Sequence, residues 1–589
     1  MGNKLTRITV IVLAVVIIVL FLLALGYYFF LNPKLAHPAE DTSRFFPPNT
    51  RIYASVNLRP GVRQIRHAIR IMSVFKATDD DIKETEAAFP EQVEDRFDDF
   101  EDETGISIEQ ELFTWIGPEI AIGLVDSGED LSLDSLEAVA FVGTTDPKST
   151  EDFIDHVVDE YSSKDVIVIK KAIGDLVSYE VSFTDTSEEL HLTITKEYLV
   201  LATTQNLLHD TLSMMDTPTN SLYDNPNFQK ARQSVADPRF AMLYVDINRL
   251  IQDANKLQQN PDSDALEILE DQLPDFIGAS ASFTDMGIRV TGSWDTPSDQ
   301  PVVKSNNQFR SSEILPSDTL ALISVTGVLE GWFAAKDWAD ETLPDLSSFI
   351  SDTGLSNGEL NFDIDEILNE IEKETGIDVD DDIFSWMRAE VAFAVLSADI
   401  KTGSILDSVE ETTVHALGII ELVDDFDQDN AKVGLRNIRN SLEEAGIDFD
   451  SRGIQGEHVT MADLQDNLGY EPGYLILEDQ VLIGSTGSAF DQALSVRAKA
   501  VGSLSDYEEY RLVLKESSGT PNGLLYINVN KTVEAIVDGL SPSERADYQK
   551  NVASFVEPIN TFSIVSAGGE QYTSVTVLLT FAEARIEEK

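Results

Sequence analysis

The sequence predicts an α+β protein in which an apolar N-terminal segment precedes two tandem homologous modules. Three observations predict it. Short β-rich runs follow one another with only a turn between them, helical patterns lie between those runs, and the order of the motifs repeats about 270 residues later. Each module should therefore hold a mixed, largely antiparallel sheet with helices on one face.

The chain begins with an apolar segment, residues 8–31, that contains no charged side chain. As a helix with about 1.5 Å rise per residue it would be roughly 36 Å long, enough to cross a hydrocarbon core of about 30 Å. Lys4 and Arg7 precede it and favour a cytoplasmic N-terminus. A cleaved signal peptide would be shorter and would end in small residues, whereas residues 27–31 are bulky. We therefore expect an uncleaved signal-anchor helix in the lipid bilayer.

The anchor and the repeat together predict the order of segments along the chain. We expect a cytoplasmic tail at 1–7, the transmembrane signal-anchor helix at 8–31, a linker at 32–44, a first module at 45–295, a linker at 296–310, a second module at 311–582 and a charged C-terminal tail at 583–589. The protein should thus cross the cell membrane once, with its body outside the cytoplasm.

The repeat is read from short motifs that keep their order while their spacing drifts. The Pro-x-Asn/Asp-Thr entry into an apolar run recurs from Thr50 to Thr319, an offset of 269 residues. Glu-Thr-Gly-Ile recurs from Glu103 to Glu374, an offset of 271, and an apolar run beginning at Leu243 returns at Leu525, an offset of 282. A preserved order with a drifting offset is what duplication followed by loop insertions produces. Each module is as long as a full domain.

Within the modules, hydrophobic periodicity predicts individual elements. We expect strands at 139–143, 177–183, 191–195 and 199–203 and around Val290, and helices at 149–161, 206–215 and 488–496. Acidic helical stretches are expected at 79–103 and 363–374. Trp115 and Trp386 follow the Glu-Thr-Gly-Ile motif in each copy and are expected to anchor the core.

The composition excludes several classes of function. The 104 acidic residues against 42 Lys and Arg give a net charge of −62, which repels nucleic-acid phosphates and anionic headgroups. The chain has no cysteine, which removes disulfides, thiolate catalysis and Cys-ligated metals. A disulfide-stapled animal ectodomain is therefore disfavoured, and a bacterial cell envelope fits better.

The anchor, the Pro-x-Asn/Asp-Thr strand entry and the Glu-Thr-Gly-Ile element before an aromatic pair together resemble the uncharacterised bacterial DUF3352 family. The resemblance covers nearly all of the chain after residue 44. It implies a bacterial, envelope-located protein with a domain of unknown function, and it supplies no activity, cofactor or catalytic residue.

Several motifs resemble catalytic motifs, but the sequence around them does not provide the structural setting that those motifs require. Residues 354–358 fit the G-x-S-x-G pattern, but a polar stretch precedes them where a buried strand is needed. Ser73, Ser305 and Lys401 supply S-x-x-K-like partner motifs, yet they fall at a helix end, in a linker and in the second module. We therefore assign no catalytic residue.

The motifs that could bind a metal or a cofactor also lack required residues. Residues 425–436 begin like a calcium loop but have Asn430 and Arg436 where Gly and Glu are required, so an acidic helix N-terminus is favoured. The aspartates at 378 and 380–382 fit a capped helix start, with weak binding of divalent cations as the alternative. The seven histidines show no zinc spacing. We assign no cofactor and no metal ligand.

These observations favour a non-enzymatic binding, scaffold or assembly protein of the bacterial envelope, whose protein or ligand partners the sequence does not name. Two alternatives stay open. One is an envelope hydrolase that uses a carboxylate pair, since only spatial proximity would reveal such a pair among so many acidic residues. The other is a carrier of an apolar ligand bound on the sheet of each module.

Overall fold

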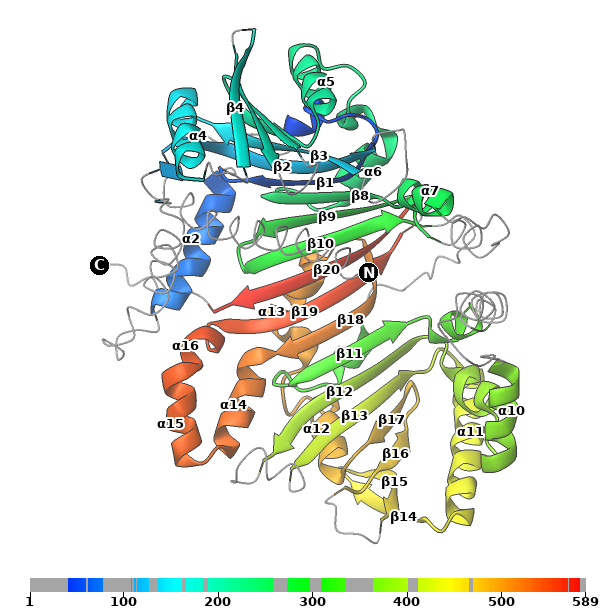
Figure 1. Cartoon of the computed structure of the whole chain (residues 1–589). Helices are drawn as coiled ribbons and strands as arrows, with labels where there is room; N and C mark the ends of the chain where they lie inside the picture. Colours follow the sequence, from blue (N-terminus) through cyan, green and yellow to red (C-terminus); the bar gives the residue numbers. More distant parts are fainter. Residues whose placement is uncertain are drawn as a thin grey trace. The chain divides into compact units, whose positions relative to one another are not determined.

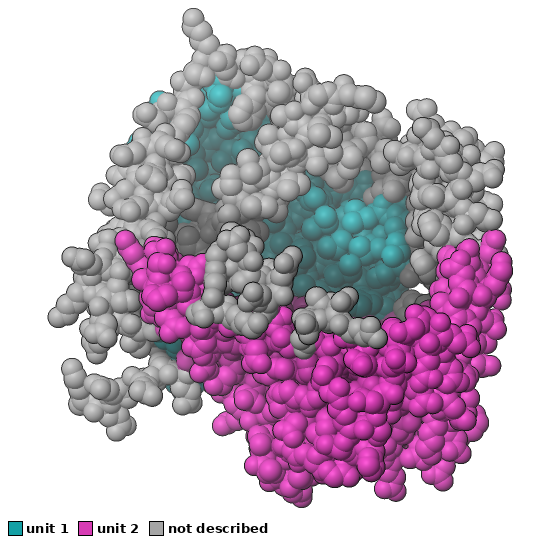
Figure 2. Space-filling model, turned by 90° about the horizontal axis from the view of Figure 1, so that it is seen from below, with its two compact units in different colours: residues 1–259, 273–295, 583–589 teal, residues 260–272, 296–582 magenta. Residues whose placement is uncertain are grey.

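A computed structural model of the chain shows an α+β fold that divides into two compact units (Figures 1 and 2). Unit 1 comprises residues 1–259, 273–295 and 583–589, and unit 2 comprises 260–272 and 296–582. The structure describes residues 41–59, 62–77, 107, 111–112, 114–126, 136–161, 166–174, 176–183, 189–257, 273–296, 309–334, 336, 364–400, 412–464, 470–517, 519–569 and 571–582.

Unit 1 contains ten described strands in one antiparallel sheet. Their order across the sheet is β4-β5-β6-β7-β3-β2-β1-β8-β9-β10. The strands are β1 (Thr50–Asn57), β2 (Ile116–Asp126), β3 (Leu136–Thr144), β4 (Val166–Ile173), β5 (Leu176–Phe183), β6 (Glu189–Ile194), β7 (Tyr198–Ala202), β8 (Ala241–Asp246), β9 (Phe276–Phe283) and β10 (Gly287–Asp295).

The helices of unit 1 connect these strands. They are η1 (Asp41–Phe45), α2 (Val62–Ala77), α4 (Pro147–Tyr161), α5 (Gln205–Asp216), η4 (Leu222–Asp224), α6 (Pro226–Ser234) and α7 (Ile247–Leu257). Local chemistry sets their starts: Thr204 caps α5 through Leu207 N, and Asn225 caps α6, which has Pro226 in its first turn.

Unit 2 also contains ten described strands in one antiparallel sheet, in the order β14-β15-β16-β17-β13-β12-β11-β18-β19-β20. The strands are β11 (Ala321–Thr326), β12 (Glu390–Asp399), β13 (Thr413–Glu421), β14 (Asp448–Ile454), β15 (Glu457–Asp463), β16 (Gly473–Ile476), β17 (Gln480–Gly484), β18 (Thr520–Asn528), β19 (Ile559–Gly568) and β20 (Tyr572–Phe581).

The helices of unit 2 include the longest described one, α11. They are η5 (Arg310–Glu313), α10 (Ile364–Thr375), η6 (Val379–Ile383), η7 (Phe384–Trp386), α11 (Asp425–Glu444), α12 (Gly487–Arg497), η9 (Leu504–Asp506), α13 (Glu508–Glu516), α14 (Val529–Gly539), α15 (Pro542–Asn551) and α16 (Ala553–Val556).

The α+β class and the antiparallel sheet predicted from the sequence are confirmed, with two corrections. Every described strand pairing is antiparallel, so neither sheet is mixed. Helices also pack on both faces of each sheet and not on one. In unit 2, Phe490 of α12 packs with Leu482 on one face, whereas Leu435 of α11 packs with Val481 on the other. The reason is that consecutive strand residues are apolar and point to opposite faces.

The linker boundaries also need correction. Residues 41–44 were expected in a linker, but they lie in η1, where Thr42 and Ser43 are fully buried. Phe309 and Arg310 belong to the start of unit 2, where Phe309 is 4% exposed in the core. Both segments are held by side chains that lie far along the chain, Glu119 for Thr42 and Glu421 for Arg310. A polar sequence alone does not indicate such long-range contacts.

The predicted tryptophan anchors are buried as expected, with Trp115 2% and Trp386 1% exposed. No helix among the described residues is long and apolar enough to cross a membrane. The predicted anchor at 8–31, the acidic stretch at 79–103 and the C-terminal tail at 583–589 lie outside the described residues.

Candidate functional site

The candidate site is one face of the unit 2 sheet, formed where the central strands expose apolar side chains. On β11, alternate residues point to opposite faces, so Leu322 and Ser324 are fully buried while Ile323 is 50% and Val325 44% exposed. On β12, Phe393 lies between two buried alanines and is 53% exposed. Such exposure is unusual for central strands.

Strand register aligns these side chains into one row. Ile323 pairs with Phe393 on one side and with Leu525 on the other. The row continues through direct cross-strand partners, in the order Ile483, Gly418, Phe393, Ile323, Leu525, Ile564 and Val577. We call these seven residues the apolar row. They belong to β17, β13, β12, β11, β18, β19 and β20, which lie in that order across the sheet (Figure 1).

The apolar row is partly flanked by the packed core of the same face. Trp386 and α11 cover the neighbouring positions Val391, Ile420 and Val481. These groups leave Phe393, Ile323 and Ile483 of the row exposed, with Ile483 at 41% exposure. Gly418 lies directly beside Ile483, and a Cβ placed at Gly418 would lie 3.6 Å from Ile483 Cβ, an ordinary van der Waals contact.

The described strand positions that surround the row carry no charge. The positions of β11, β12, β18, β19 and β20 that share this face are Ala321, Ile323, Val325, Val391, Phe393, Val395, Gly523, Leu525, Ile527, Phe562, Ile564, Ser566, Val575, Val577 and Leu579. None of the fifteen is charged, although a quarter of the whole chain is. An uncharged, partly exposed sheet face in so acidic a chain is a candidate interaction surface.

Among the described residues, each unit holds one buried glutamate, and both act within the fold. In unit 2, Glu390 is 2% exposed and accepts hydrogen bonds from Ser311 N at 3.0 Å, from the Ser311 hydroxyl, and from Ser324 Oγ at 2.6 Å. Burial raises the pKa of Glu390, and these hydrogen bonds oppose the shift. The carboxylate fastens η5 to the sheet.

In unit 1, Glu119 plays the same part for η1. It is fully buried and accepts hydrogen bonds from Thr42 Oγ1 at 2.8 Å and from Thr42 N at 3.3 Å. The Tyr53 hydroxyl lies 3.5 Å from the same carboxylate. Glu119 and Glu390 are thus each engaged by the short helix of their own unit.

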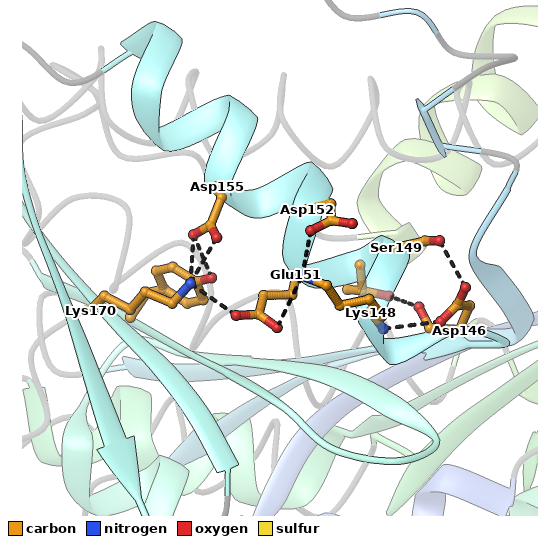
Figure 3. A network of polar contacts seen from close by, with 9 residues as sticks. Asp146, Lys148, Ser149, Glu151, Asp152, Asp155 and Lys170 are labelled. Carbon is orange, nitrogen blue, oxygen red and sulfur yellow. Dashed lines mark hydrogen bonds and ion pairs between the residues drawn. The ribbon is translucent and has the colours of Figure 1, made fainter.

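A larger polar network joins α4 to the β4–β5 hairpin on the surface of unit 1 (Figure 3). Lys170 Nζ lies 2.7 Å from Asp155 Oδ2 and 3.0 Å from Glu151 Oε1, and the Tyr179 hydroxyl donates to Asp155 Oδ1 at 2.8 Å. Burial raises the pKa of Tyr179 to about 12. Burial alone would raise the pKa of Asp155, but the bonds from Lys170 and Tyr179 lower it. Lys170 is held by carboxylates, so it is not a free nucleophile.

One trio in unit 2 has the geometry of a proton relay. His415 Nδ1 lies 2.7 Å from Thr486 Oγ1, and its Nε2 lies 3.1 Å from Asp399 Oδ2. The hydroxyl of Thr486, however, caps α12 by accepting from Ala489 N, and the residue is 6% exposed. A nucleophile must reach its substrate. We therefore read the trio as a helix cap held in place by a histidine.

A cavity of about 340 Å³ lies in unit 1, lined in part by Pro48, Asn225, Asp246 and Arg249. Several of its polar groups are engaged in hydrogen bonds within the fold. Arg249 Nη1 donates to Pro48 O at 3.0 Å, Asp246 accepts from Arg249 N at 3.1 Å, and Asn225 caps α6. The side chains that line the cavity therefore hold neighbouring loops and helices together.

The structure places the sequence motifs as follows. Asp424 caps α11 and Asp427 is fully buried, bonded to Arg388, so the calcium-like segment is a helix N-terminus as predicted. Asp378 caps η6 by accepting from Asp381 N, and Asp382 accepts from Asp378 N at 3.0 Å, so this segment is a capped helix start. Among the described residues no group of three or more His, Asp or Glu side chains could hold a metal ion.

The remaining motifs are placed only in part. Ser73 lies inside α2, whereas residues 354–358, Ser305 and Lys401 lie outside the described residues. The sequence did not reveal the apolar row or the buried glutamates. Its only signal for the row was that residues 391–396 are apolar at every position, which is typical of a strand buried on both faces.

Comparisons with known proteins give a family and no activity. The model of a family described as protein of unknown function, DUF3352, matches residues 11–581. No curated protein matches the chain. A solved structure described as crystal form III of TP0453 is similar at 14% identity over 45% of this chain and 82% of that chain, with a TM-score of 0.23.

Proposed function

The chain belongs to the DUF3352 family of proteins of unknown function, and we propose that it is a membrane-anchored, non-enzymatic binding protein of the bacterial cell envelope. The binding surface is the uncharged face of the unit 2 sheet that contains the apolar row. The exposure of Phe393, Ile323 and Val325 on central strands is the observation that carries the proposal.

Exposed apolar area of this kind is costly in water, at about 25 cal/mol per Å². Single exposed apolar residues are ordinary on protein surfaces, but a contiguous row across the middle of a sheet is not. A binding role accounts for the row because an occupant would remove these side chains from water. The polar clusters support the absence of catalysis, since the carboxylates, Lys170 and Thr486 are engaged in the contacts that hold the fold.

We also propose that the two units are copies of one module. Three observations support duplication. The strand order of unit 2 is that of unit 1 with each number increased by ten. The hydroxyls of Thr50 and Thr319 each donate to the carbonyl of a proline three residues earlier, at 2.7 Å in both. Glu119 and Glu390 lie at the same place in their sheets, fastening the short helix before the first strand.

The membrane location rests on the sequence. Residues 8–31 would anchor the chain in the bilayer, and Lys4 and Arg7 would keep the N-terminus in the cytoplasm, so both units would face the outside. A second candidate function, a carrier of an apolar ligand, is favoured by the same uncharged face. It differs from a scaffold only in releasing what it binds.

The absence of cysteine makes the proposal directly testable, because a single introduced cysteine is the only thiol in the chain. We propose Phe393→Cys on the face and Phe426→Cys as the control. Phe426 is an exposed phenylalanine of α11, 64% exposed against 53% for Phe393. Each variant is treated with a membrane-impermeant maleimide in intact spheroplasts, and as purified full chain in nanodiscs.

We expect the control position to react in spheroplasts as readily as in the purified chain, because the body lies outside. The face position should react normally when purified and be protected in spheroplasts, where its occupant is present. Equal reactivity of both positions in spheroplasts would disprove the binding role. A control position that reacts only after lysis would disprove the extracytoplasmic location.

A further inference from the structure

We infer that the apolar row of unit 2 binds the acyl chain of a single-chain, uncharged lipid. The inference rests on the proposed function and deepens it by naming the chemistry of the occupant. It follows from the length of the exposed part of the row, from its lack of charge, and from the residue types that surround it.

The length of the exposed segment matches an acyl chain. From Ile483 on β17 through Gly418 and Phe393 to Ile323 on β11, the row crosses three strand spacings. At about 4.8 Å each, these span about 14 Å. The acyl chains of one membrane leaflet fill half of a hydrocarbon core of about 30 Å, or about 15 Å. One chain lying across the strands would cover the exposed residues.

The charge of the protein selects what can approach. The chain carries a net charge of −62, whereas the fifteen positions of the face carry none. An anionic ligand would be repelled on approach, and a cationic one would find no partner on the face itself. An uncharged hydrocarbon complements both properties.

The residue types favour hydrocarbon over a protein partner. Protein interfaces concentrate Tyr, Trp and Arg at their centres and surround them with a polar rim. The fifteen positions of the face contain none of those three residues, and Ser566 is the single polar one. Most of the side chains are aliphatic. Small residues such as Ala321 and Gly523 lie among them and project little from the sheet. A ligand without hydrogen-bonding groups fits such a lining.

The test uses the full chain in phosphatidylcholine nanodiscs, with monopalmitoylglycerol as the probe. Phe393→Cys and Ile323→Cys report on the row, and Phe426→Cys is the control. The rate of maleimide labelling is measured against probe concentration, with glycerol as the headgroup control. Circular dichroism and the labelling rates without probe establish that each variant is folded.

We expect labelling at both row positions to slow by about tenfold when the probe is at ten times its half-saturating concentration. The control position and the glycerol series should not change. Protection at Phe393→Cys in spheroplasts with no effect of the probe in nanodiscs would overturn the acyl inference and leave the binding role standing. Absence of protection in both settings would overturn both. Equal slowing at all three positions, which indicates nonspecific adsorption, would also overturn the inference.

Discussion

Replacing the buried glutamate of unit 2 tests how η5 is fastened to its sheet. Glu390→Ala removes the acceptor for Ser311 N and for the hydroxyls of Ser311 and Ser324. The backbone N–H of Ser311 is buried and would lose this acceptor, at about 1–3 kcal/mol, whereas the hydroxyls can rotate toward other acceptors. We expect a total loss of roughly 2–4 kcal/mol, since removal of the buried carboxylate also relieves its desolvation.

The neutral isostere Glu390→Gln should behave differently. Its side-chain oxygen can accept from Ser311 N, and its amide can donate to the two hydroxyls once they turn to accept. Because burial raises the pKa of Glu390, the native fold binds a proton here more tightly than the unfolded chain does. Stability from this group is therefore full below the unfolded pKa of about 4.3 and falls as pH rises through the folded pKa. Relative to wild type, Glu390→Gln should gain stability as pH rises through that window.

Thermal unfolding of the full chain, followed by tryptophan fluorescence, provides the assay, because Trp386 is buried in the same unit. At roughly 2–4 °C per kcal/mol, Glu390→Ala should lower the unfolding temperature of unit 2 by roughly 5–15 °C. The exposed Glu457→Ala serves as the control and should stay within about 0.5 kcal/mol of wild type. An unchanged midpoint for Glu390→Ala would refute the fastening role. A loss in Glu390→Gln equal to that in Glu390→Ala would show that the ionised form is required.

Three further outcomes are expected. Gly434→Ala should destabilise unit 2 by at least about 1–3 kcal/mol in denaturant unfolding, because its Cβ would lie 2.2 Å from the carbonyl oxygen of Asp382; a neutral effect would show that η6 yields easily. Lys170→Met should weaken unit 1 at neutral pH but not below the unfolded pKa of Asp155, about 3.9, since the lowered pKa of that carboxyl stabilises the fold only above it; a loss that persists at acid pH would contradict this. Phe393→Asp should leave the unfolding temperature within about 2 °C, because the side chain is half exposed, and a large drop would show that it belongs to the core.

The sequence predicted much of the local structure because periodicity and caps are local properties. The expected helix at 149–161 is α4, which begins at Pro147, and the expected strand at 199–203 is β7, which ends one residue earlier. The tryptophans were expected in the core because large aromatic residues dominate packing, and they are there.

The candidate site was not predictable because it depends on which face of a strand finds a cover. Residues 391–396 are apolar throughout, and that pattern predicts burial on both sides. The structure buries Ala392 and Ala394 on one side and leaves Phe393 exposed on the other. Which face of the strand is covered depends on where the neighbouring helices pack, and that packing is a property of the tertiary structure.

The buried glutamates escaped notice for a similar reason. Glu119 and Glu390 are two of 104 acidic residues, and their partners in η1 and η5 lie 77 and 79 residues earlier in the chain. The predicted boundaries place Thr42 in a linker, because its segment is polar, and Ser311 at the first position of the second module. A polar segment whose groups donate hydrogen bonds to a distant buried carboxylate has no distinct sequence pattern.

The most direct test of the account compares two labelling ratios. For Phe393→Cys and for Phe426→Cys, the maleimide rate in intact spheroplasts is divided by the rate in the purified full chain. The account predicts a ratio near one at the control position and a ratio far below one on the sheet face. Equal ratios at the two positions would show that nothing occupies the face in the envelope, and the proposed function would fall.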